Sequence, residues 1–225
     1  MPEMRGNARA AHWLRHRAVR AARAAYLGLE RSRLAPFLDL PPVRHLKARV
    51  THTPAARVLE VLDLLAPTGV SVWIAGGWGV DALLGRQTRR HSDLDLVISD
   101  SGEEYRKVAD VLQREGFHPD EPESTPGLVM PLRCAWRHDN GHSLEIMPVA
   151  LQAPPFKAAP AGARTSAGGP PFTYGCISGR TVPCVSAGLQ FTLHEEYGYP
   201  LRDIDEADLG LLHAHIHGTE KTMLA

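Results

Sequence analysis

The sequence of 225 residues has few cysteines and no long hydrophobic run, and both features exclude classes of protein. Its three cysteines, Cys134, Cys176 and Cys184, are an odd number without CxxC spacing, so neither a disulfide framework nor a thiolate zinc site is predicted. No apolar run approaches the roughly 20 residues of a membrane span, and the Arg-rich start lacks the apolar core of a secretory signal. We therefore expect buried free thiols in a cytoplasmic protein with no membrane partner.

The chain also lacks net charge, with 25 Lys and Arg against 25 Asp and Glu. Residues 1–50 nevertheless hold 11 basic against three acidic residues, which leaves the remaining 175 residues mildly acidic, with 14 against 22. A balanced total makes a nucleic-acid partner unlikely. The basic segment is rich in Ala, Arg and Leu and is predicted to form a helical extension, either solvated or serving as a docking surface for nucleic acid or a membrane.

Hydrophobic periodicity and turn residues predict alternating helices and strands after residue 51. The first half is expected to contain a helix capped by Thr53 and ending at Pro67, a strand 70–75, a short helix 78–84, a strand 93–99, and a helix from Ser101 to about Glu115. The second half is expected to contain strands 128–138 and 142–149 joined by a turn at 139–141, a short strand 181–184, and helices beginning at Ser186 and Asp203.

This order predicts an α+β fold, a mixed sheet with helices on one side. The domain organisation expected is a basic helical extension over 1–50, a core over 51–152, a Pro/Gly/Ala-rich loop over 153–175, and a C-terminal strand and helical subdomain over 176–225. Whether the chain is a monomer or a homodimer cannot be derived from these patterns.

Two aspartates lie two residues apart in the predicted strand 93–99. Side chains two apart share one face of a strand, so Asp93 and Asp95 should project side by side while Leu94 and Leu96 enter the core. Two neighbouring carboxylates repel each other unless they are solvated, protonated or neutralised. A magnesium ion is the natural neutraliser where phosphate is also bound, because it takes few protein carboxylates and completes its octahedron with water and phosphate oxygens.

A third carboxylate, Glu145, lies in the predicted strand 142–149. If this strand lies beside the Asp93 strand, Glu145 completes an acidic cluster. The cluster could bind two ions, or one ion with Glu145 acting as the general base, and the sequence does not choose between them.

Gly76 and Gly77 follow a predicted buried strand and precede a short helix. Such a turn brings bare backbone N–H groups and a helix N-terminus against phosphates. Positive charge follows before the acidic pair and could meet the triphosphate or the leaving pyrophosphate; the residues concerned are Arg86, Arg89, Arg90 and His91. Each arginine alone is explained equally well as a surface charge.

The stretch WIAGGWGVDALLGRQTRRHSDLDLVIS, residues 73–99, resembles the nucleotidyltransferase signature of the DNA polymerase beta superfamily, in the branch of aminoglycoside and lincosamide nucleotidyltransferases. The resemblance continues in HSLEIMPV, residues 142–149, and over residues 177–209. It implies a polymerase-beta-like fold with Asp93 and Asp95 as metal ligands, Glu145 at the third carboxylate position, and Gly76, Gly77 and Trp78 beside the nucleotide. The third position is often aspartate in these relatives.

The resemblance implies a magnesium-dependent transfer of a nucleoside monophosphate, AMP from ATP, to a hydroxyl of a small molecule such as an aminoglycoside or a lincosamide, with release of pyrophosphate. Three alternatives remain open: a metal-dependent glycosyltransferase, a protein of this fold that acts on RNA or protein, and a non-catalytic binding protein.

Overall fold

The computed structural model describes residues 52–99, 101–119, 134–138, 142–151, 170–195 and 203–223. The predicted basic extension, the turn at 139–141 and most of the predicted loop lie outside these ranges. Within them, no helix combines the length and apolar character needed to cross a membrane.

A seven-stranded mixed sheet forms the centre of the fold, with strand order β3-β4-β5-β2-β1-β7-β6. The strands are β1 (Trp73–Ala75), β2 (Leu94–Ser99), β3 (Phe117–Pro119), β4 (Cys134–His138), β5 (Ser143–Val149), β6 (Phe172–Ile177) and β7 (Arg180–Val185). The pairs β2–β5 and β1–β7 are parallel, and every other neighbouring pair is antiparallel. The mixed sheet predicted from the order of elements is confirmed.

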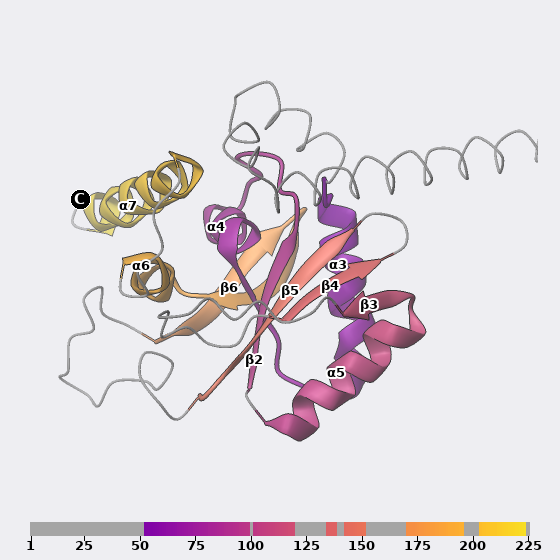
Figure 1. The fold of residues 1–225 in the computed structure, drawn as a ribbon. Coiled ribbons are helices and arrows are strands. Elements are labelled where there is room, and N and C mark those ends of the chain that lie inside the picture. The colour runs from indigo at the N-terminus through magenta and orange to yellow at the C-terminus, as the bar shows by residue number, and fades with distance from the viewer. Residues whose placement is uncertain are drawn as a thin grey trace, which may run out of the picture.

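Five α-helices and a short 3-10 helix accompany this sheet in the described part of the chain. They are α3 (Ala55–Leu65), η2 (Ala66–Thr68), α4 (Gly76–Leu84), α5 (Gly102–Arg114), α6 (Ala187–Glu195) and α7 (Asp203–Met223). Figure 1 shows α3 and α5 on one side of the sheet and α6 and α7 on the other. The expectation that the helices lie on one side is therefore wrong.

Two apolar clusters explain this arrangement, because strand residues alternate between the two faces of the sheet. The larger cluster joins Leu94, Leu96 and Ile98 of β2 to buried side chains of α3, α4 and α5. The smaller cluster joins Val97 and neighbouring strand residues to Leu189 of α6. Both faces of the central strands thus carry apolar residues, and each needs its own helical cover.

Local sequence signals account for several element ends. Ser101 caps α5 by accepting a hydrogen bond from the Glu104 N–H at 3.5 Å, and Gly116 follows the helix with a positive φ of 81°. The prediction for this helix is confirmed. Thr53 was expected to cap α3, but its hydroxyl donates instead to the Ser92 carbonyl, and Pro54 occupies the N-cap position without a side-chain hydrogen bond.

Four further predictions differ from the structure. The helix predicted over 78–84 begins two residues earlier, at Gly76, and the strand predicted over 70–75 contains only Trp73–Ala75. The loop predicted over 153–175 ends earlier, because β6 begins at Phe172. β6 and β7 join the central sheet beside β1, so the strand assigned to the C-terminal subdomain belongs to the core sheet.

Candidate active site

Two of the three predicted carboxylates lie on neighbouring parallel strands, and the third directly precedes one of these strands. Asp95 of β2 is in register with Glu145 of β5, and Asp93 immediately precedes β2. All three residues are half-buried, whereas Leu94 and Leu144, which are also in register, are buried on the opposite face. The pleat therefore places carboxylates on one face and the larger core on the other. Glu145 was expected to complete the acidic cluster if its strand lay beside the strand that follows Asp93. β5 does lie beside β2, so this condition is met.

Gly76 packs directly against Asp95. Ala75 is the register partner of Asp95, so the chain leaves β1 and enters α4 beside that carboxylate. Gly76 has a φ of 55°, and a Cβ atom at this position would overlap the Asp95 carboxylate. Both the positive φ and the close approach require glycine. The first helical residue of α4 thus lies directly against the Asp95 carboxylate.

Gly77, the second residue of α4, lies against two basic side chains. A Cβ atom on Gly77 would overlap His91 Nδ1 and would come within 2.5 Å of Arg89 Nη2. The first N–H groups of a helix have no partner within the helix, and they attract anions. The N-terminus of α4, the imidazole and the guanidinium therefore converge at one point beside Asp95, which is chemistry suited to a phosphate.

A buried hydrogen-bond network holds His91 in this position. Its Nε2 donates to Asp81 Oδ2 at 2.5 Å, and Asp81 Oδ1 accepts from the Thr88 hydroxyl at 2.5 Å and the Thr88 N–H at 3.0 Å. Burial alone raises the pKa of Asp81, but the hydrogen bonds from His91 and Thr88 outweigh it and lower the pKa below its usual value. Because Asp81 accepts the hydrogen bond from Nε2, the Nδ1 edge of the His91 ring faces Gly77.

The two C-terminal helices also reach the start of α4. Asp208 of α7 forms an ion pair of 2.6 Å with Arg89, and Gln190 of α6 donates from Nε2 to the Gly76 carbonyl at 3.1 Å. Sequence reasoning missed Asp81, Asp208 and Gln190 as site residues. All three lie within stretches that carry the resemblance, but nothing local distinguishes them from structural polar residues.

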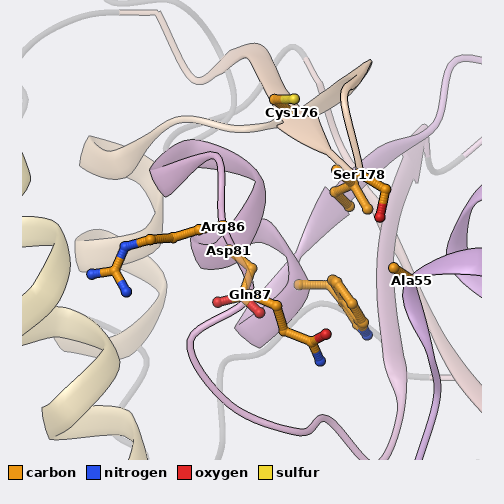
Figure 2. Close-up of a pocket in the computed structure, with 8 residues that line it drawn as sticks. Ala55, Asp81, Arg86, Gln87, Cys176 and Ser178 are labelled. Atoms are coloured by element: carbon orange, nitrogen blue, oxygen red, sulfur yellow. The ribbon is translucent and has the colours of Figure 1, made fainter.

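The remaining predicted binding residues are placed differently. Arg86 follows α4, at the end of the helix opposite Gly76. A helix of nine residues is about 13 Å long, so Arg86 lies far from the Gly76 end. It lines a small pocket of about 50 Å³ with Gln87 and Ser178, and its side chain points away from theirs (Figure 2). Arg86 and Arg90 are both exposed. The contact of both arginines with the triphosphate stays a prediction. For Arg86, its place at the end of α4 opposite Gly76 does not favour that contact.

Trp78, which is predicted to lie beside the nucleotide, has its ring in the larger apolar cluster. The residue is only 2% exposed, and its ring lies 4.8 Å from the His91 ring, centroid to centroid. As the third residue of α4, it points toward the larger apolar cluster, because Trp78 and Ala82 lie one helical turn apart on the same side. Its side chain packs against His91, and its contact with the nucleotide stays a prediction.

The donor chemistry of the site fits magnesium to a limited extent. In the described residues, no group of three His, Cys, Asp or Glu side chains is arranged to hold a metal ion. Asp95 and Glu145 are adjacent in register, however, and magnesium is commonly held by one or two carboxylates together with substrate phosphates. Gly76 packs against the Asp95 carboxylate, so the N-terminus of α4 lies directly beside this candidate ligand.

Comparisons with known proteins identify the family of the chain. The family model of aminoglycoside-2''-adenylyltransferases matches residues 57–212. A lincosamide resistance protein of Staphylococcus haemolyticus is 30% identical over 151 residues, 66% of this chain and 88% of that protein. A 2''-aminoglycoside nucleotidyltransferase of Klebsiella pneumoniae is 41% identical over 46 residues, 26% of its length.

Solved structures show the same fold. The lincosamide antibiotic adenylyltransferase LnuA, solved with lincomycin bound, aligns with a TM-score of 0.53 and 27% identity, covering 72% of this chain and 98% of that one. ANT(2'')-Ia in complex with adenylyl-2''-tobramycin aligns with a TM-score of 0.52 and 24% identity, covering 76% and 92%.

The fold and the comparisons define the class of protein: the chain is a nucleotidyltransferase. It belongs to the aminoglycoside-2''-adenylyltransferase family, whose model covers most of the described residues. The resemblance recognised in residues 73–99 is thereby confirmed at the level of the family.

Proposed function

We propose that this protein transfers AMP from ATP to a hydroxyl of a small antibiotic-like acceptor, with release of pyrophosphate, and that a lincosamide is the preferred acceptor class. The observation that carries the proposal is the register of Asp95 with Glu145 directly beside Gly76, at the N-terminus of α4. Carboxylates and open backbone N–H groups meet there within one site.

The phosphate side of the reaction is assigned to α4 and the residues against it. The N–H groups of the first turn and the Arg89 guanidinium bind the β and γ phosphates, and Gly76 lets the triphosphate approach the backbone closely. These groups stabilise the negative charge that builds on pyrophosphate as the bond from the α phosphorus to the leaving oxygen breaks.

The hydroxyl side is assigned to the carboxylates. The acceptor oxygen attacks the α phosphorus in line with the leaving pyrophosphate, and its proton passes to Glu145 acting as general base. Asp93 and Asp95 are the residues that would hold magnesium, and Glu145 would be a further ligand if a second ion binds. The metal, when bound, neutralises phosphate charge.

Two observations support a lincosamide over an aminoglycoside. In sequence, the match to the lincosamide resistance protein spans 88% of that relative, whereas the match to the Klebsiella pneumoniae 2''-aminoglycoside nucleotidyltransferase spans 26%. Half-buried apolar residues also lie on the face of the sheet that carries Asp95: Trp73, in register with Val97, stacks on Phe172 with ring centroids 3.9 Å apart. A partly apolar acceptor with sugar hydroxyls suits such a surface better than a polycation does.

The test is pyrophosphate release by the purified full chain with magnesium and each of the four nucleoside triphosphates, against panels of lincosamides and aminoglycosides. We expect release that needs a lincosamide and ATP, and a product heavier by one adenylyl group in mass spectrometry. Asp93→Asn should abolish the release. Asp63→Asn, which changes an exposed carboxylate paired with Arg180 away from the site, should not.

Each alternative outcome has a definite meaning. Release with aminoglycosides alone would overturn the acceptor class and keep the transferase. Full activity in Asp93→Asn would overturn the assignment of the carboxylates. Calorimetry that shows no binding of ATP with magnesium, together with no release, would overturn the proposed function and favour a non-catalytic binding protein.

A further inference from the structure

Arg89, which lies against Gly77, is held in place by a residue from the far end of the chain. Its Nε donates to Asp208 Oδ1 and Oδ2 at 3.1 and 3.2 Å, and its Nη2 donates to Oδ2 at 2.6 Å. The Asp208 side chain is 7% exposed, whereas that of Arg89 is 28% exposed. The carboxylate is thus the fixed partner, and the arginine is the partner that retains access to solvent.

The same end of α4 is contacted from a second C-terminal helix. Gln190 of α6 is fully buried, and its Nε2 donates to the Gly76 carbonyl at 3.1 Å. A Cβ atom on Gly79 would come within 2.5 Å of this nitrogen, so α4 and α6 touch closely. The C-terminal helices therefore contact this end of α4 in two ways. Gln190 binds the Gly76 backbone, and Asp208 binds the Arg89 side chain that lies against Gly77.

We propose that Asp208 is a positioning residue for nucleotide binding, which acts by holding the Arg89 guanidinium over Gly77 where it meets the phosphates of the triphosphate. This inference rests on the proposed function and adds a residue of α7 to it. It assigns to the C-terminal helices a part in binding the nucleotide, in addition to whatever they contribute to the acceptor.

Two effects of Asp208 oppose each other, and the geometry decides between them. The carboxylate partly neutralises Arg89, which weakens the attraction of Arg89 for phosphate. It also fixes a long side chain that would otherwise lose conformational freedom when the nucleotide binds. A bidentate contact to a buried carboxylate restrains the plane of the guanidinium. We therefore infer that the gain from a fixed Arg89 position exceeds the loss from its partly neutralised charge.

The experiment compares the steady-state kinetics of Asp208→Asn, Asp208→Glu and the wild-type full chain. We expect Asp208→Asn to raise the KM for ATP about tenfold, the scale of a lost charge-assisted hydrogen bond, with the KM for the acceptor nearly unchanged. Asp208→Glu keeps the charge and should restore part of the loss. Glu206→Gln, an exposed acid on the same helix, is the matched control and should behave as the wild type.

A double-mutant cycle separates positioning from general support of the fold. In an Arg89→Ala background, Asp208→Asn should add no further increase in the KM for ATP, because the residue through which Asp208 acts is absent. Melting temperatures of all variants should be measured together with the kinetics. An Asp208→Asn effect that persists without Arg89 would overturn the inference and indicate a structural role.

Other outcomes distinguish this inference from the proposed function. An active wild type with an unchanged or lower KM for ATP in Asp208→Asn would overturn the positioning role and leave the proposed function intact. A wild type that neither releases pyrophosphate nor binds ATP would overturn both.

Discussion

The two faces of β2 and β5 differ in chemistry although they belong to the same short strands. On one face Leu94, Leu96 and Leu144 are buried in the larger apolar cluster. On the other face Asp95 and Glu145 stand in register and half-buried. Because the strand period is two, the site carboxylates and the leucines of the larger cluster occupy alternate positions, and Val97 of the smaller cluster shares the face of Asp95.

This separation predicts that substitutions one residue apart have opposite consequences. Substitutions of the carboxylates on the site face should change turnover with little effect on the free energy of unfolding. Those on the core face should lower the free energy of unfolding and change turnover only through loss of folded protein. Four measurements can break or sharpen the comparison.

The largest effect is expected from Asp95→Asn on the site face. Loss of a carboxylate assigned to the metal should reduce turnover about a thousandfold, a scale typical of removing a group that stabilises the transition state. Folding should be unimpaired, because the substitution removes repulsion between like charges. Pyrophosphate release and urea unfolding measure the two quantities. A marked loss of stability would show that the faces are not separate.

Leu96→Ala, one residue further along β2, should have the reverse effect. Leu96 is fully buried, and truncating such a leucine costs about 3 kcal/mol through lost burial and the cavity that remains. Turnover per folded molecule should stay near that of the wild type. Urea unfolding gives the stability, and kinetics at a temperature where the variant is folded gives the turnover. A greatly reduced turnover of the folded variant would contradict the comparison.

Gly76→Ala should affect both stability and turnover, because Gly76 has a positive φ and packs against the Asp95 carboxylate. A positive φ costs an alanine about 1–2 kcal/mol, and the new Cβ would displace the Asp95 carboxylate. Gly85→Ala is the matched control, since Gly85 has a φ of 67° with open space around it. We expect similar losses of stability and a loss of turnover in Gly76→Ala alone. Equal turnover in both variants would exclude the contact with Asp95.

Asp81 provides the smallest and most specific test, as a buried carboxylate beside the larger core. Its pKa is lowered in the folded state, because hydrogen bonds from His91 and Thr88 outweigh the effect of burial. The stability that it contributes is therefore present above the usual value of 3.8 and is lost as the pH falls through the lower folded pKa. The difference in unfolding free energy between wild type and Asp81→Asn should shrink below about pH 4.

Urea titrations of both proteins between pH 3 and pH 7 measure this difference. A constant difference over that range would show that Asp81 does not titrate with a lowered pKa. A shrinking difference would show that a carboxylate on the core side contributes to stability, in contrast to Asp95.

The sequence predicted the elements whose signals are local. β2 was predicted from its alternation, α5 from Ser101 and Gly116, and the β4–β5 pairing from the turn residues between two apolar runs. It missed β3, which has only three residues, and β6, which contains Gly175. A Cβ atom on Gly175 would overlap the Ala82 carbonyl of α4, so this tertiary contact requires glycine. Glycine inside a segment disfavours a strand prediction from the sequence.

The candidate site divides in the same way. By itself the sequence determined the acidic pair, the glycines before it and the family, because these depend on spacing within one segment. Only the tertiary structure decided that β5 places Glu145 beside Asp95, that Arg89 rather than Arg86 lies against Gly77, and that Asp208 and Gln190 reach α4. The physical reason is that strand register and helix packing bring together residues separated by 12 to 119 positions, and no local pattern encodes such contacts.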